Sequence, residues 1–167
     1  MKTATWKNEK KIGKEIASIM KHSCPSDNAS GIAPDELTLS CFFDDKMLVI
    51  GLIRKGVTSK LFSEIQQSTP FNLSEWAEFL NISGKSLSRY LQNSKAFKAT
   101  QSERIIEMTE VTYKGLEVFG SMDNFKAWIE TPNYALGNLT PKELLKDSYG
   151  KELVLGELHK INYGIFA

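Results

Sequence analysis

The 167-residue sequence predicts an all-α fold, in which a helix-turn-helix precedes a second, smaller set of helices. No stretch alternates apolar and polar residues between turn signals, so no β-sheet is expected. Apolar residues recur instead at helical spacing, and Ser, Thr, Asp, Gly and Pro punctuate the chain where helices begin or end. Hydrophobic residues make up 41% and charged residues 25% of the chain, a composition typical of globular domains.

Residues 1–43 are expected to form an extension ahead of the helix-turn-helix. A stripe of apolar residues predicts a short amphipathic helix, and its members are Ile12, Ile16, Ile19 and Met20. Residues 23–36 are rich in Ser, Pro, Asn, Asp and Gly, which predicts a linker. The helix has two interpretations. It could contact DNA, a partner or the body of the protein, or it could be a solvated helix packed loosely on the domain.

Residues 44–98 are expected to form the DNA-binding domain, and it begins with a buried helix from Met47 to Ile53. Asp44 and Asp45 precede that helix, where carboxylates favour the helix dipole. Three more helices are expected here because hydroxyl side chains cap free amides at helix starts. The expected caps are Thr58, Ser74 and Ser83.

Residues 99–167 are expected to form the second domain. Two segments, 100–103 and 140–143, match the capping box. In this motif the Thr side chain accepts a hydrogen bond from the backbone amide of Glu, and the Glu side chain accepts one from the backbone amide of Thr. The first should open a long helix to Phe119 that Gly120 ends, and the second carries Pro141 at its first helical position. A last helix is expected from about Lys151 to Asn162.

The segment from residue 73 to 92 fits a helix-turn-helix. Ala77 supplies the small residue where two helices cross, and Asn81 tolerates the left-handed backbone of the turn. The second helix of this motif enters the major groove, where Arg, Lys and Ser bond base edges. The residues expected to bind DNA are Ser83, Lys85, Ser86, Ser88, Arg89 and Lys95. The alternative is a helical hairpin that keeps the shape without binding DNA.

Charge along the chain agrees with a nucleic-acid face joined to a protein-binding face. Residues 1–104 carry 15 Lys and Arg against 11 Asp and Glu, whereas residues 105–167 carry 6 against 9. No acidic residue lies between Glu78 and Glu103, as a surface that faces phosphates requires.

An ordered series of motifs in the C-terminal half resembles the Xre/MbcA/ParS toxin-binding domain. The motifs are Ala99-Thr-Gln-Ser-Glu-Arg-Ile105, Leu116-Glu-Val-Phe-Gly120, Ala127-Trp-Ile, Thr131-Pro-Asn-Tyr-Ala-Leu-Gly137, Leu139-Thr-Pro-Lys-Glu-Leu-Leu145 and Ile161-Asn-Tyr-Gly164. The helix-turn-helix precedes them, as in that family, and the resemblance covers roughly residues 44–167. The same residues also have purely structural interpretations, with Trp128 as a core anchor and Gly115 as a close approach of two helices.

The resemblance implies a type II antitoxin whose partner is a RES-domain toxin that consumes NAD, or a related ADP-ribosylating toxin. In that family the C-terminal part covers the entrance to the toxin's active site. The toxin contacts that it implies here are Asn133, Leu136, Gly137, Asn138, Pro141, Lys160, Tyr163, Gly164, Ile165, Phe166 and Ala167. The alternative for the apolar tail, residues 163–167, is that it folds back on its own domain.

Other functions find little support in the sequence. There is no catalytic motif, so we expect no enzyme and no cofactor. His22 and Cys24 could suggest a ligand pair, but two cysteines are too few for a structural zinc site, so no metal is expected. Without a membrane span or secretory signal we expect a cytoplasmic protein. A homodimer that reads operator DNA and forms a higher-order complex with the toxin is expected, and a stand-alone transcription regulator with a helical dimerisation domain is the alternative.

Overall fold

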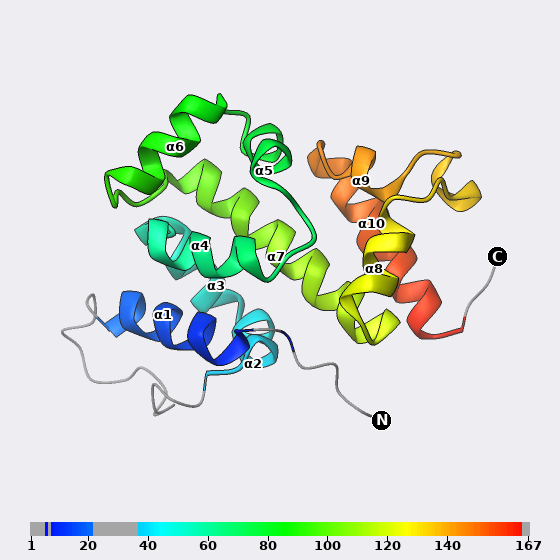
Figure 1. Ribbon diagram of the computed structural model, residues 1–167. Helices are drawn as coiled ribbons and strands as arrows, with labels where there is room; N and C mark the ends of the chain where they lie inside the picture. Colours follow the sequence, from blue (N-terminus) through cyan, green and yellow to red (C-terminus); the bar gives the residue numbers. More distant parts are fainter. Residues whose placement is uncertain (1–5, 7, 22–36, 165–167) are drawn as a thin grey trace.

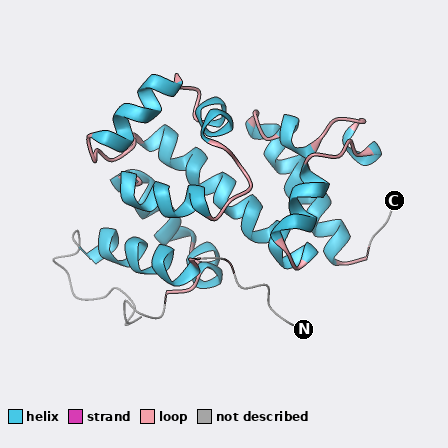
Figure 2. Ribbon diagram, viewed as in Figure 1, coloured by secondary structure: helices cyan, strands magenta, loops and turns pink. Residues whose placement is uncertain are grey.

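The computed structural model describes residues 6, 8–21 and 37–164, and this part of the chain is helical with no strand (Figure 2). The helices are α1 (Glu9–Lys21), α2 (Leu39–Asp44), α3 (Lys46–Lys55), α4 (Ser59–Gln67), α5 (Leu73–Phe79), α6 (Gly84–Gln92), α7 (Ala99–Phe119), α8 (Met122–Ile129), the 3-10 helix η1 (Tyr134–Leu136), α9 (Pro141–Leu144) and α10 (Ser148–Asn162). The all-α prediction is confirmed. The expected linker at residues 23–36, His22 and Cys24 lie outside the described residues.

Helix α7 runs through the middle of the molecule between the helix-turn-helix and the C-terminal helices (Figure 1). Its 21 residues give it a length of about 30 Å. It packs against α3 on one side and against α8 and α10 on the other. Apolar and small polar residues are therefore buried around most of its circumference, from Ser102 to Leu116.

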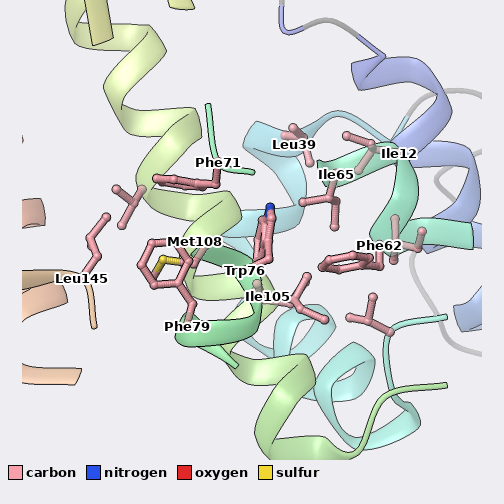
Figure 3. Packing of buried hydrophobic residues seen from close by; sticks show 14 of the residues in the cluster. Ile12, Leu39, Phe62, Ile65, Phe71, Trp76, Phe79, Ile105, Met108 and Leu145 are labelled. Carbon is pink, nitrogen blue, oxygen red and sulfur yellow. The ribbon is translucent and has the colours of Figure 1, made fainter. Parts of the chain in front are cut away.

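An aromatic cluster joins the helix-turn-helix to α4 and α7 (Figure 3). Trp76 of α5 is fully buried, with its ring centroid 5.2 Å from that of Phe62 and 5.9 Å from that of Phe71. Phe79 packs edge-on against Phe71 at 5.0 Å. Such edge-to-face pairs stabilise a core beyond their apolar area. The cluster fixes where α5 lies and hence where the following helix projects.

The described part of the N-terminal extension is built into this core. Ile12 and Ile16 of α1 are buried, and Glu15 pairs with Lys60 of α4 at 2.5 Å. The Lys55 ammonium donates to the carbonyl oxygens of Ile19 and Met20 at the end of α1. The predicted amphipathic helix is thus confirmed, and its apolar stripe packs on α3 and α4.

Most predicted helix ends are confirmed. The hydroxyls of Thr58 and Ser83 accept hydrogen bonds from amides of the first turns of α4 and α6. Ser121 caps α8 in the same way. Thr140 forms the predicted capping box, in which its N–H donates to the Glu143 carboxylate at 2.9 Å. Gly120 ends α7 with a left-handed φ of 71°.

Two predicted caps are wrong. Asn72, not Ser74, caps α5, because its side chain accepts from the Glu75 amide at 2.9 Å while Glu75 accepts from the Asn72 amide at 2.8 Å. No capping box opens α7 at Thr100, because the helix already begins at Ala99. Within the first turn, the Ser102 hydroxyl accepts from the Val57 amide at 2.8 Å and binds the helix start to the α3–α4 turn.

Three further predictions need correction. The helix expected to be buried from Met47 to Ile53 is α3, but its Met47 side chain is 72% exposed and only Leu52 is fully buried. Helix α2 was not expected, since six residues are too few to establish a period. Helix α10 begins at Ser148 rather than near Lys151, with Asp147 in the extended backbone that precedes it.

Candidate functional site

The turn between α5 and α6 has the geometry that the helix-turn-helix requires. Asn81 has a φ of 51°, so the predicted left-handed residue of the turn is confirmed. The Ile82 amide donates to the Ala77 carbonyl oxygen at 3.0 Å, which closes the turn. Ser83 then starts α6 by accepting from the Ser86 amide at 3.1 Å.

One face of α6 packs on the core, and the other projects from the molecule. Leu87 is buried, while Lys85, Ser88 and Arg89 are exposed. Ser83 and Lys95, beyond the two ends of the helix, are exposed as well, and Ser86 is half-buried. Lys85, Ser88 and Arg89 therefore share one exposed face of α6, whereas Ser83 lies just before the helix and Lys95 just after it.

The cations of this face are not neutralised by the described part of the chain. Among the described residues, no ion pair joins Lys85, Arg89, Lys95 or Lys98 to a carboxylate, whereas Lys142, Lys146, Lys151 and Lys160 on the C-terminal helices are paired. A surface that binds phosphates needs cations that are available to release counterions. Lys85 and Arg89 on the exposed face of α6 are therefore available to an anionic ligand.

The loop between α8 and α9 is organised by Asn133. Its side chain accepts from the Ala135 amide at 2.9 Å, and its backbone N–H donates to the Leu139 carbonyl oxygen at 3.0 Å. Gly137 and Asn138 turn the chain with φ values of 71° and 62°. The loop is thus held in a defined shape by its own backbone.

The residues of this loop divide into supports and exposed groups. Leu136 and Pro141 are buried, and Asn133 is half-buried, whereas Gly137 and Asn138 are exposed. Beside them, Tyr134 is 87% exposed and Leu139 is 46% exposed. Sequence reasoning did not single out this apolar pair, because residues in an irregular loop show no period that separates inward from outward side chains.

The last turn of α10 carries the second group of predicted contacts. Lys160, Tyr163 and Gly164 are exposed. Together with Leu155, Gly156 and His159, the first two line a shallow depression of about 430 Å³. The predicted contacts Ile165, Phe166 and Ala167 lie outside the described residues.

Ion pairs connect the helix-turn-helix to α9, which follows the loop. Lys142 contacts Glu75 of α5 and lies 3.1 Å from Glu130, and Lys146 lies 3.0 Å from Glu78. Burial lowers the pKa of Lys142, but hydrogen bonds and charges of the two glutamates outweigh it, so that the pKa is raised overall. These ion pairs thus bring α9, which follows the loop, next to α5.

Within the described ranges, no group of three or more His, Cys, Asp or Glu side chains could hold a metal ion. None of the described helices is both long and apolar enough to cross a membrane.

Two family models match the chain in the same order as its two surfaces. The model of the antitoxin Xre-like helix-turn-helix domain matches residues 49–109. The model of the antitoxin Xre/MbcA/ParS C-terminal toxin-binding domain matches residues 114–164. Together they cover more than half of the sequence. The chain belongs to the Xre/MbcA/ParS antitoxin family. The exposed face of α6 thus lies in the helix-turn-helix domain of this antitoxin, and the Asn133 loop and α10 lie in its toxin-binding domain.

Curated relatives of the antitoxin have similar lengths. Antitoxin Xre of Photorhabdus laumondii subsp. laumondii is 25% identical over 68% of this chain and 78% of the relative. The Prs ADP-ribosylating antitoxin of Sphingobium sp. is 25% identical over 71% of this chain and 80% of the relative. Antitoxin Xre of Yersinia enterocolitica is 25% identical over 72% of this chain and 82% of the relative.

Proposed function

We propose that this antitoxin binds and blocks a RES-type toxin that consumes NAD or ADP-ribosylates a target, as one half of a type II toxin–antitoxin system. The observation that carries the proposal is the match of residues 114–164 to the toxin-binding domain. A relative named as an ADP-ribosylating antitoxin supports this chemistry for the toxin. The antitoxin itself acts by binding and not as an enzyme, and it works in the cytoplasm.

The toxin contacts come from the loop and from the C-terminal end. Gly137 and Asn138 of the loop are exposed and held in place, so they meet the toxin without a cost of ordering. Asn133, Leu136 and Pro141 support the loop from below. Lys160, Tyr163 and Gly164 lead into the apolar tail of Ile165, Phe166 and Ala167, which covers the toxin's active-site entrance.

The exposed face of α6 binds the operator of the antitoxin's own operon and represses it. Lys85 and Arg89 contact bases and phosphates, with Ser83, Ser86, Ser88 and Lys95 beside them. Two copies read two half-sites, since helix-turn-helix proteins bind DNA as dimers. In this proposal residues 44–98 form the DNA-binding domain and residues 99–167 the toxin-binding domain.

Toxicity relief tests the proposal. The reading frame beside the antitoxin gene is expected to encode a RES-domain protein that arrests growth when expressed alone and not when co-expressed with the antitoxin. Deleting residues 163–167 should weaken this rescue while the helical circular dichroism spectrum and cooperative unfolding persist. Lys126→Ala, an exposed change on α8, is the matched control and should rescue fully. If the neighbouring reading frame is not toxic, the proposed toxin partner is contradicted. If the shortened chain rescues growth fully, the proposed contact of the tail with the toxin is contradicted.

A stand-alone transcription regulator is the second candidate. The unpaired cations of α6 are the observation that favours it, because they need only DNA as a ligand. It predicts that the chain binds operator DNA although the reading frame beside its gene encodes no toxin. The same co-expression experiment therefore separates the two functions.

A further inference from the structure

The outward face of α10 is an apolar stripe that nothing in the described chain covers. The inward face carries the buried residues Gly150, Val154 and Leu158. On the outward face, Tyr149 is 84% exposed and Leu153 56% exposed. Soluble helices usually expose charged residues, so aromatic and apolar residues at helical spacing indicate a covered surface.

The stripe is symmetric about Gly156. Tyr149 lies seven residues before this glycine and Tyr163 seven residues after it, about 10 Å away along the axis in either direction. Glu152 and Lys160 lie four residues before and after it. A Cβ added at Gly156 would meet no atom within 4 Å, so the middle of the stripe is open to a close approach.

We propose that α10 pairs antiparallel with α10 of a second copy of this chain, with the two helices crossing at Gly156. A two-fold axis there places each residue opposite the one at the same distance on the other side. Tyr149 then faces Tyr163 of the partner subunit, and Glu152 faces Lys160 of the partner subunit. Both pairs form twice, and the opposite charges specify the antiparallel direction.

The depression on α10 provides the hole for a knob of the second copy. Leu153 precedes Gly156 by three residues, so in this arrangement it meets the surface beside His159 of the partner subunit. His159, Lys160 and Tyr163 line that depression together with Gly156. A leucine that inserts there buries apolar surface from both copies, which is the main driving force for association.

The rest of the fold permits this pairing. Helix α6 lies on the side of the molecule away from α10 (Figure 1), so both DNA-binding faces stay free in the pair. The pairing goes beyond the proposed toxin binding and does not depend on it. Because Lys160 and Tyr163 belong to both surfaces, a toxin bound at the last turn of α10 competes with the second copy there.

A charge exchange tests the pairing with the antitoxin alone. Sedimentation velocity of the full chain should give a monomer–dimer equilibrium with a dissociation constant on the order of 10 µM, as for a small interface. Glu152→Lys or Lys160→Glu alone should weaken it about tenfold, since each replaces two attractions by two repulsions. The double variant should return it to near the wild-type value. Lys126→Glu is the matched control and should change nothing.

A steric variant tests the crossing point independently. Gly156→Gln should weaken self-association at least tenfold and at the same time stabilise the monomer, because Gln favours the helix over Gly and finds open space here. A chain that stays monomeric to about 200 µM overturns the proposal, since a specific interface dimerises below that range. It is overturned too if the double charge variant is no better than the single ones. Loss of toxin binding with unchanged self-association in the single variants would assign the stripe to the toxin instead.

Discussion

The Arg104 guanidinium donates to the carbonyl oxygen of Leu145 at 2.6 Å, and its Nε–H donates to that of Phe79 at 3.2 Å. Leu145 directly follows α9 and Phe79 ends α5, so one side chain of α7 joins the helix-turn-helix to the helix after the Asn133 loop. Glu107 accepts a third bond at 2.6 Å. The side chain of Arg104 is only 16% exposed, which makes these bonds stronger than pairs on the open surface.

Replacing Arg104 by Met should destabilise the antitoxin by about 3 kcal/mol, because two partly buried carbonyl groups lose their donor and Glu107 keeps only its ion pair with Lys151. The free energy of unfolding in urea measures this effect. Lys114→Met breaks the exposed pair with Glu117 and should cost less than about 0.5 kcal/mol. Equal stability losses in the two variants would contradict a special role of Arg104.

The sequence was sufficient to predict what depends on local chemistry. Caps such as Thr58 and Ser83 work within one helical turn, and the left-handed Asn81 follows from the backbone of a tight turn. The exposed face of α6 was predicted for the same reason, since one buried Leu87 fixes which side of that helix is left outside. The order of motifs was sufficient for the family.

What the sequence did not reveal depends on contacts between distant residues. The capping box expected at Thr100 was wrong because α7 already begins at Ala99, where the Ser102 hydroxyl binds the helix start to the amide of Val57, 45 residues away in the sequence. Met47 was expected inside because the composition of a short apolar run does not say which side faces the core. The exposed Tyr134 and Leu139 belong to an irregular loop, for which no periodic pattern exists.

Gly115 lies under the ring of Phe125, and a Cβ there would overlap that ring. Gly115→Ala should therefore destabilise the antitoxin by about 1–3 kcal/mol although Ala is the better helix former. Gly156→Ala, also within a helix but in open space, should stabilise it by up to about 1 kcal/mol. Thermal unfolding at low protein concentration compares the two. If Gly115→Ala proved as stabilising as Gly156→Ala, α8 would not be packed closely on α7.

Tyr113 links α7 to the N-terminal segment, with its ring 6.2 Å from that of Trp6 and 5.8 Å from that of Phe43. Burial raises the pKa of Tyr113 to about 12, helped by the charges of Glu117 and Glu9 and opposed by a hydrogen bond with Ser40.

The fold thus favours neutral Tyr113, whose ordinary pKa is about 10. The contribution of neutral Tyr113 to the free energy of unfolding is complete below pH 10 and is lost as the pH rises from about 10 to 12. Urea unfolding across this range should show a decline that is smaller in Tyr113→Phe. Ultraviolet titration of the wild type should show a tyrosine that ionises near pH 12 and is missing in Tyr113→Phe. An identical decline in Tyr113→Phe would assign the pH dependence to other groups.

Lys85 and Arg89 project from α6 without a carboxylate partner in the described chain, so operator affinity should depend on them and on salt. Each Ala variant should weaken binding and lower the slope of log affinity against log salt by about 1 per phosphate contact removed. Fluorescence anisotropy with the promoter DNA at several salt concentrations measures both quantities. Lys126→Ala on α8 should leave the slope unchanged, because α8 lies on the side of the molecule away from α6 (Figure 1). If the wild-type protein bound its promoter without salt dependence, or not at all, the helix-turn-helix would serve only as a structural hairpin.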